Sequence, residues 1–174
     1  PPVQNQLGST RPRVGNRRMT TELASSPRRA TKATRAPDWP DSAFGRPRQF
    51  LGNRFVYAVI SPRARGLSIG VNMNPDKRCN FDCAYCEVNR QSPSPEKFLD
   101  VDVMAEELEQ TLELVYSGEL QNFSCYKNTP ADLLELRHVA LSGDGEPTLC
   151  PNFLAAVRAA VHVRALGRFP FFKI

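Results

Sequence analysis

The stretch GLSIGVNMNPDKRCNFDCAYC, residues 66–86, joins an alternating apolar segment to three closely spaced cysteines. In its first part, residues 66–73, the apolar side chains Leu67, Ile69 and Val71 alternate with smaller residues. Successive side chains of a β-strand point to opposite faces, so this alternation indicates a strand. We therefore predict a strand that ends where a cysteine loop begins.

The segments on both sides show further strand and helix patterns. Apolar runs at 55–60 and 136–142 predict strands, and the run at 169–174 predicts the start of another. Apolar residues spaced three and four apart predict amphipathic helices over 101–120 and 152–166. The order strand, loop, helix, strand, turn, helix, strand is typical of parallel βαβ units, so we expect an α/β fold.

The ends of the two helices have their own signals. Asp100 or Asp102 is expected to cap the helix over 101–120, because a carboxylate accepts hydrogen bonds from the first free N–H groups. Gly118 is expected to end that helix and Gly167 to end the second one, because glycine readily adopts the left-handed conformation that follows many helices.

Cys79, Cys83 and Cys86 have the spacing C-x3-C-x2-C. Iron–sulfur clusters are usually held by cysteine thiolates, typically four of them. Three local cysteines would leave one iron of a four-iron cluster open to a small molecule. The chain contains five cysteines and opens with no signal peptide, which disfavours a secreted disulfide framework and favours metal or redox chemistry in a reducing compartment.

Two other interpretations of the cysteines stay open at this point. A structural zinc site needs four closed ligands, but no second C-x2-C pair exists to complete one. The fourth ligand would have to come from Cys125, Cys150, His138 or His162. Alternatively Cys83 and Cys86 form a dithiol redox pair, which would give Cys79 no role. Outside these hypotheses, we interpret both histidines as packed or exposed residues and Cys125 and Cys150 as ordinary thiols or auxiliary ligands.

Two motifs in this order resemble the radical S-adenosylmethionine (SAM) superfamily. NPDKRCNFDCAYC, residues 74–86, is similar to its N-P-x-x-x-C-N-x-x-C-x-Y-C context. About sixty residues on, after the next predicted strand, Asp144-Gly145-Glu146-Pro147 resembles its GGEP motif, which contacts the amino group of SAM. The sequence departs from that motif because Asp144 replaces the first glycine, although Gly143 precedes it. The resemblance covers about residues 66–174.

The resemblance implies a site and a reaction. Cys79, Cys83 and Cys86 would ligate a 4Fe–4S cluster whose open iron chelates SAM, and Tyr85 would lie beside the adenine. The residues of the second motif implied to bind SAM are Gly143, Asp144, Gly145, Glu146 and Pro147. Reductive cleavage would give methionine and a 5′-deoxyadenosyl radical that abstracts hydrogen from a substrate. Such an enzyme needs an electron donor such as flavodoxin or ferredoxin.

The resemblance also implies a partial (β/α)6 barrel, related to the TIM barrel. Residues 49–174 would form about two and a half βα units of it, so we expect a truncated N-terminal part of a larger enzyme. The form SGDGEPTL, residues 142–149, is similar to the tRNA wyosine-synthesis and activating-enzyme branches, without fixing a substrate. Asn89 and Arg90, which follow the cluster, either anchor the loop or form a solvated loop end.

The basic character of the chain belongs to its first part. Residues 1–48 contain 10 of the 23 Lys and Arg, 3 of the 18 Asp and Glu, and 7 of the 15 prolines, which gives a net charge of +7. Residues 49–174 have a net charge of −2. Because 1–48 has few large apolar residues, we predict a disordered tail.

Three interpretations of that tail compete. It is a solvated extension, an organelle transit peptide, or a basic arm that contacts RNA such as tRNA. Met19 is a further hypothesis for the true start of the protein. No apolar run is long enough to span a membrane, which excludes an integral membrane protein, and we expect a cytoplasmic location. The alternative to the enzyme is a non-catalytic zinc- or iron-binding module that uses the basic tail to contact RNA.

Overall fold

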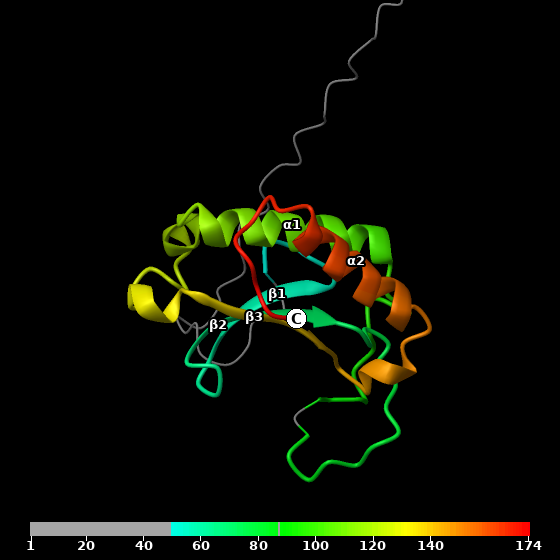
Figure 1. Ribbon diagram of the computed structural model, residues 1–174. Coiled ribbons are helices and arrows are strands. Elements are labelled where there is room, and N and C mark those ends of the chain that lie inside the picture. The colour runs from blue at the N-terminus through cyan, green and yellow to red at the C-terminus, as the bar shows by residue number, and fades with distance from the viewer. Residues whose placement is uncertain (1–49, 87) are drawn as a thin grey trace, which may run out of the picture. The chain divides into compact units, whose positions relative to one another are not determined.

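A computed structural model describes residues 50–86 and 88–174 (Figure 1). The predicted tail over 1–48 and the hypothesis about Met19 lie outside these residues. The described residues contain both motifs.

Three strands form one mixed sheet in the order β1–β2–β3. They are β1 (Val56–Ser61), β2 (Gly66–Asn72) and β3 (Leu136–Ser142), so all three strands predicted before residue 150 are confirmed. β2 and β3 are parallel, as a βαβ unit requires. β1 and β2 are antiparallel and form a hairpin with Ser61 opposite Gly66, which the sequence analysis did not predict.

Two α-helices lie where the sequence predicts them. α1 (Val101–Tyr116) begins after Asp100, whose carboxylate accepts the N–H groups of Asp102 and Val103, so Asp100 is the cap. It ends four residues earlier than predicted, and Gly118 follows it with a φ of 78°. α2 (Phe153–Ala165) is followed by Gly167 with a φ of 66°.

Three short 3-10 helices lie in the connections between these elements. η1 (Glu119–Asn122) and η2 (Ala131–Leu133) lie between α1 and β3, in the stretch that showed no regular pattern. η3 (Pro147–Leu149) lies between β3 and α2, directly after the glycine-rich turn.

Both α-helices pack on the same face of the sheet (Figure 1). The sheet contributes alternate apolar side chains, as a strand with one covered face does. The buried residues shared by the two helices and the sheet include Met104, Leu108, Leu112, Ala156, Ala160, Val163, Val56, Ile69, Val71 and Val139. This packing fixes the parallel pair β2–β3, and with it the positions at which the two motifs begin.

Polar side chains lie on the opposite face of the sheet. The Tyr57 and Ser142 hydroxyls are 3.0 Å apart, and the Tyr57 ring crosses β2 directly over Gly70. A Cβ at Gly70 would lie 2.2 Å from the Tyr57 ring. Ser68 Oγ and His138 Nε2 form a second pair at 3.0 Å. This face therefore differs in chemistry from the helix-covered one.

The strand predicted over 169–174 is present only as a single bridge. Lys173 pairs with His138 in the parallel direction, and the N–H of Val139 donates to the Lys173 carbonyl at 2.8 Å. The chain thus returns to the free edge of β3 after α2, but it forms no extended strand there.

Candidate cofactor site at the carboxyl ends of β2 and β3

The two motifs lie at the same edge of the sheet. The cysteine loop follows the last residue of β2, and the glycine-rich turn over 143–147 follows the last residue of β3. Since β2 and β3 are adjacent and parallel, their carboxyl ends meet at one edge. Open parallel sheets bind their ligands at that edge, so the placement is that of a binding site.

The glycine-rich turn docks directly on the cysteine loop. The N–H of Glu146 donates to the carbonyl of Arg78, the residue before Cys79, at 3.1 Å. Gly145 makes this approach possible, because a Cβ there would lie 1.8 Å from the Arg78 carbonyl oxygen. Positive φ angles occur at other glycines of the described segment and not at Gly145, so close backbone approach is what requires a glycine here.

Asp144, the departure from the family motif, is bonded to the end of β2. Asn72 Nδ2 donates to Asp144 Oδ2 at 2.9 Å, and the Asp144 N–H donates to Asn72 Oδ1 at 3.0 Å. The amide of Asn72 therefore bonds both the backbone and the side chain of Asp144. This two-way contact gives a physical reason for a carboxylate at a position where the family has glycine.

Gly143 packs against Asn74, the second residue after β2. A Cβ on Gly143 would lie 2.7 Å from Asn74 Oδ1 and 2.9 Å from the Asn74 nitrogen. Asn74 is only 2% exposed, and its Oδ1 is the one buried side-chain oxygen or nitrogen without a hydrogen-bond partner in the described segment. Gly143 and Gly145 are thus both required by contacts with the loop after β2.

Glu146 and Pro147 form the start of η3. Glu146 Oε1 accepts from the Thr148 N–H at 3.2 Å and from the Thr148 hydroxyl at 2.7 Å, and Pro147 occupies the first helical position. Proline suits that position because its missing N–H would have no helical partner. These bonds fix the direction of the Glu146 carboxylate at the edge of the site.

The three predicted ligand cysteines lie on the loop after β2. Cys86 is exposed, Cys79 and Cys83 are partly exposed, and the Cys86 N–H donates to the Cys83 carbonyl at 2.9 Å. Cys79 Sγ accepts from the Phe81 N–H at 3.4 Å. Within residues 50–86 and 88–174, no three His, Cys, Asp or Glu side chains are gathered closely enough to hold a metal ion. Convergence of the three sulfurs stays a prediction.

Lys77 closes this loop, and the sequence analysis missed it. Its ammonium donates to the Asn89 carbonyl at 2.8 Å, the Ser92 carbonyl at 2.9 Å and the Ser92 hydroxyl at 2.7 Å. Lys77 also has a φ of 62°, in the left-handed region. A lysine before a cysteine cluster gives no sequence signal for such a contact, because its acceptors are mainly backbone carbonyls.

Arg90 anchors the same loop from the other side. Its guanidinium donates to the Phe81 carbonyl at 3.4 and 3.5 Å and to Cys86 Sγ at 3.8 Å. For Arg90 these bonds favour loop anchoring, and the side chains of both Asn89 and Arg90 are exposed. Hydrogen bonds to cysteine sulfurs are also a means by which proteins tune an iron–sulfur cluster.

Tyr85 is the most exposed aromatic residue of the loop. Its side chain is 85% exposed. The pKa of its phenol is raised, mainly by a hydrogen bond and charge interaction with Cys83, while the Arg63 guanidinium acts in the opposite direction. Tyr85 thus interacts with a predicted ligand cysteine, and its place beside an adenine stays a prediction.

The other two cysteines pack away from the loop. Cys150 is buried in the core between the helices and the sheet, and Cys125 packs beside a second apolar cluster around Tyr126. Burial raises the pKa of both thiols. Both therefore have the surroundings of ordinary packed thiols.

Comparison with known proteins finds partial relatives. Two curated UPF0026 proteins, from two strains of Helicobacter pylori, are each 30% identical to the chain over 106 residues. The match covers 60% of the chain but only 29% of each relative, so the chain spans less than a third of their length. Their name states no activity. No family model and no solved structure matches the chain.

None of the helices within residues 50–86 and 88–174 is long and apolar enough to cross a bilayer.

Proposed function

We propose that the chain contains the cluster- and SAM-binding segment of a radical SAM enzyme. The observation that most supports this is the hydrogen bond from the Glu146 N–H to the Arg78 carbonyl. It brings together two motifs that lie about sixty residues apart and that resemble the family separately. A chance match of either motif gives no reason for them to meet at one sheet edge.

The loop cysteines fit the cofactor by the chemistry of their donors. Cys79, Cys83 and Cys86 are three thiols on one accessible loop, and thiolates are the ligands that iron–sulfur clusters prefer. When bound, a 4Fe–4S cluster of this family supplies the electron that cleaves SAM to methionine and a 5′-deoxyadenosyl radical, which abstracts hydrogen from a substrate. The protein itself binds, orients and shields these groups.

The residues around the turn over 143–147 would place SAM between this turn and the cysteine loop. The resemblance assigns the amino group of SAM to the turn over 143–147. Asn72 fixes this turn on β2 through Asp144, and Lys77 holds the loop closed. A ligand bound across both elements would therefore meet donors and acceptors whose positions are already set.

The arrangement of the sheet also supports the proposal. Both α-helices cover one face, and the chain runs from β2 to β3 to Lys173 in sequential order. In a doubly wound sheet the strand order reverses and helices cover both faces, whereas in a (β/α) barrel they stay on the outer one. A partial barrel of the (β/α)6 type is the proposed fold of the larger enzyme.

The second candidate function is a closed structural zinc site without catalysis. It requires a fourth ligand beside the three loop cysteines. Cys150 would have to leave the apolar core to serve, and Cys125 lies with the other apolar cluster. His138 lies at the start of β3 and is bonded to Ser68, and His162 is exposed on α2. These positions favour the three-ligand site over the closed one.

The test is the metal content and its response to SAM. After anaerobic reconstitution we expect four irons per chain and an electron paramagnetic resonance (EPR) spectrum of the reduced protein that changes when SAM is added. Stoichiometric zinc with no SAM response would support the structural module instead.

Variants at Glu146 separate a site role from a structural one. Glu146→Ala is expected to weaken SAM binding at least tenfold without changing the iron content. Glu106→Ala is the matched control, because it removes an exposed carboxylate of α1 and should leave SAM binding unchanged. Normal SAM binding by Glu146→Ala would contradict the assignment.

A further inference from the structure

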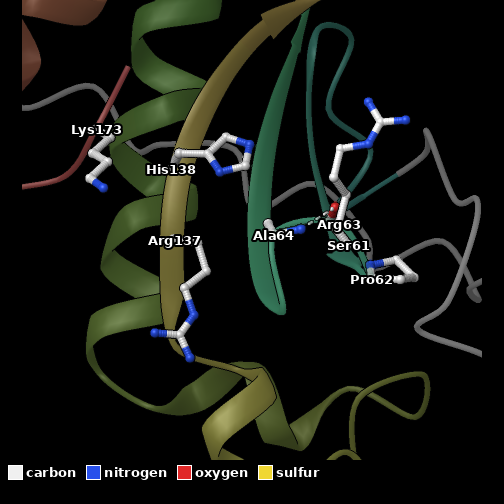
Figure 2. A pocket seen from close by; sticks show the side chains of 7 residues that line it. All are labelled: Ser61, Pro62, Arg63, Ala64, Arg137, His138 and Lys173. Atoms are coloured by element: carbon white, nitrogen blue, oxygen red, sulfur yellow. Dashed lines mark hydrogen bonds between the residues drawn. The ribbon is translucent and has the colours of Figure 1, made fainter.

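A hollow of about 760 Å3 lies at the end of the sheet where β2 and β3 begin, opposite to the end where the two motifs follow these strands. Ser61 at the end of β1 and residues 62–64 of the turn to β2 form one side, and Arg137 and His138 at the start of β3 form the other. Lys173 completes the lining (Figure 2). These residues come from three separate parts of the chain, so the hollow exists only in the folded protein.

The lining is positively charged although this part of the chain is not. Arg63, Arg137 and Lys173 are three of the seven lining residues, and none of the seven is acidic. Residues 49–174 as a whole have a net charge of −2. The gathering of three cations at one hollow is therefore a local property of the fold, and it favours an anionic ligand.

Arg137 is held in place before any ligand binds. Its Nε donates to the Arg65 carbonyl at 3.1 Å, its Nη2 to the Asp132 carbonyl at 3.3 Å, and its Nη1 lies 3.1 Å from Glu135. Gly66 leaves room for the guanidinium, because a Cβ there would lie 2.6 Å from Arg137 Nε. A side chain fixed in this way loses little conformational entropy on binding.

Arg63 and Lys173 are exposed, and no carboxylate of residues 50–86 or 88–174 pairs with either of them. The Arg63 guanidinium also acts on the Tyr85 phenol of the cysteine loop. His138 is oriented by Ser68, whose hydroxyl lies 3.0 Å from its Nε2. Figure 2 shows His138 over the strands, Arg137 and Lys173 beside β3, and Arg63 on the turn with its guanidinium directed away from Arg137 and Lys173.

We propose that this hollow binds a phosphate-bearing small molecule. Phosphate suits it because the fixed guanidinium of Arg137 and the exposed side chains of Arg63 and Lys173 can each bond an oxygen of an anion that carries several. The volume exceeds that of a single phosphate ion, so a larger phosphate-bearing molecule has room there. The proposal does not depend on the cluster or on SAM.

Inorganic pyrophosphate is the probe, and the two histidines report on it. The chain contains only His138, in the hollow, and His162, exposed on α2. At constant ionic strength, pyrophosphate is expected to shift the imidazole signals of His138 in nuclear magnetic resonance spectra with a saturable curve, while those of His162 stay in place. Unmoved His138 signals up to about 10 mM pyrophosphate, a concentration that detects even millimolar affinity, would overturn the proposal.

Charge-removing variants test which cations bind. Arg63→Gln and Lys173→Gln are each expected to weaken pyrophosphate binding about fivefold, the effect of one exposed charge contact. Both positions are exposed, so folding is expected to be unaffected. Arg158→Gln, on the exposed side of α2, is the matched control and should leave binding unchanged. Equal weakening by Arg158→Gln would show general charge attraction and overturn the proposed site.

Discussion

The backbone N–H of Glu146 donates to the backbone carbonyl of Arg78 at 3.1 Å, which joins the turn after β3 to the residue before Cys79. Because both partners are backbone groups, the contact depends on how closely the backbone of the turn approaches the backbone of the cysteine loop. Gly145 decides that approach, since any side chain there would meet the Arg78 carbonyl.

Gly145→Ala should therefore separate the two motifs. The added Cβ would lie 1.8 Å from a backbone oxygen, which cannot rotate away as a side chain can. We expect a loss of about 1–3 kcal/mol in the free energy of unfolding, as for other overpacked sites, and faster amide exchange at Glu146. Urea unfolding and hydrogen exchange measure the two effects.

Gly118→Ala is the control for Gly145→Ala. Gly118 has open space around it but a positive φ, so alanine there strains the backbone without touching the site. It should lower stability and leave the exchange rate of the Glu146 amide unchanged. If both variants raise the exchange rate of the Glu146 amide equally, the close approach of Gly145 to Arg78 is not what protects that amide.

Asp144 and Asn72 should contribute jointly to stability. Asp144→Ala removes the acceptor of the 2.9 Å bond from Asn72, and a loss of about 1–2 kcal/mol is expected. Asp144→Asn keeps an acceptor oxygen and should lose less. A double-mutant cycle with Asn72→Ala measures the coupling, and additive losses in the two single variants would contradict the two-way contact.

Local patterns were sufficient to predict most of the elements. The alternation of Leu67, Ile69 and Val71 gave β2, and Asp100 and Gly118 lie at the ends of α1 as expected. These signals arise from residues close in sequence, whose spacing matches the period of the element they form.

The hairpin of β1 and β2 had no comparable signal. Its turn, Pro62 to Arg65, contains no glycine or asparagine, the residues that usually mark such a turn. Arg65 instead takes a left-handed φ of 55°, and its N–H donates to the Pro62 carbonyl at 3.3 Å. A long side chain in that conformation is uncommon and cannot be predicted from local sequence.

The two motifs of the site were predicted from the sequence, but the residues that hold these motifs in place were not. Lys77 and Asn72 at the site, and Glu107 of α1 outside it, make their contacts with residues that are distant in the chain or with backbone groups. Such contacts depend on tertiary structure and produce no periodic pattern in the sequence. Glu107 is the extreme case, because an acidic residue on a helix is ordinarily expected on the solvent side.

Glu107 should be important for stability. It is a buried residue of α1 whose carboxylate accepts the N–H groups of Arg54, Phe55 and Val56 at 2.7, 2.9 and 3.0 Å. Glu107→Gln replaces one acceptor oxygen by an NH2 group that would face these donors, so a loss of about 2–3 kcal/mol is expected. Glu106→Gln, its exposed neighbour, should change stability little in the same urea titration. Equal losses would show that charge on the helix, and not the buried contact, is responsible.

The five cysteines should divide into two groups by their rate of alkylation. Thiolates are the reactive form, and burial raises the pKa of Cys125 and Cys150, so both should react slowly at pH 8 and faster as the pH rises. The three loop cysteines, Cys79, Cys83 and Cys86, are at least partly exposed and should react first in metal-free protein. After anaerobic loading with iron and sulfide, mass spectrometry should find these three protected together while Cys125 and Cys150 keep their slow rates. Protection that extends to Cys125 or Cys150 would indicate a fourth protein ligand, which removes the open iron that SAM requires.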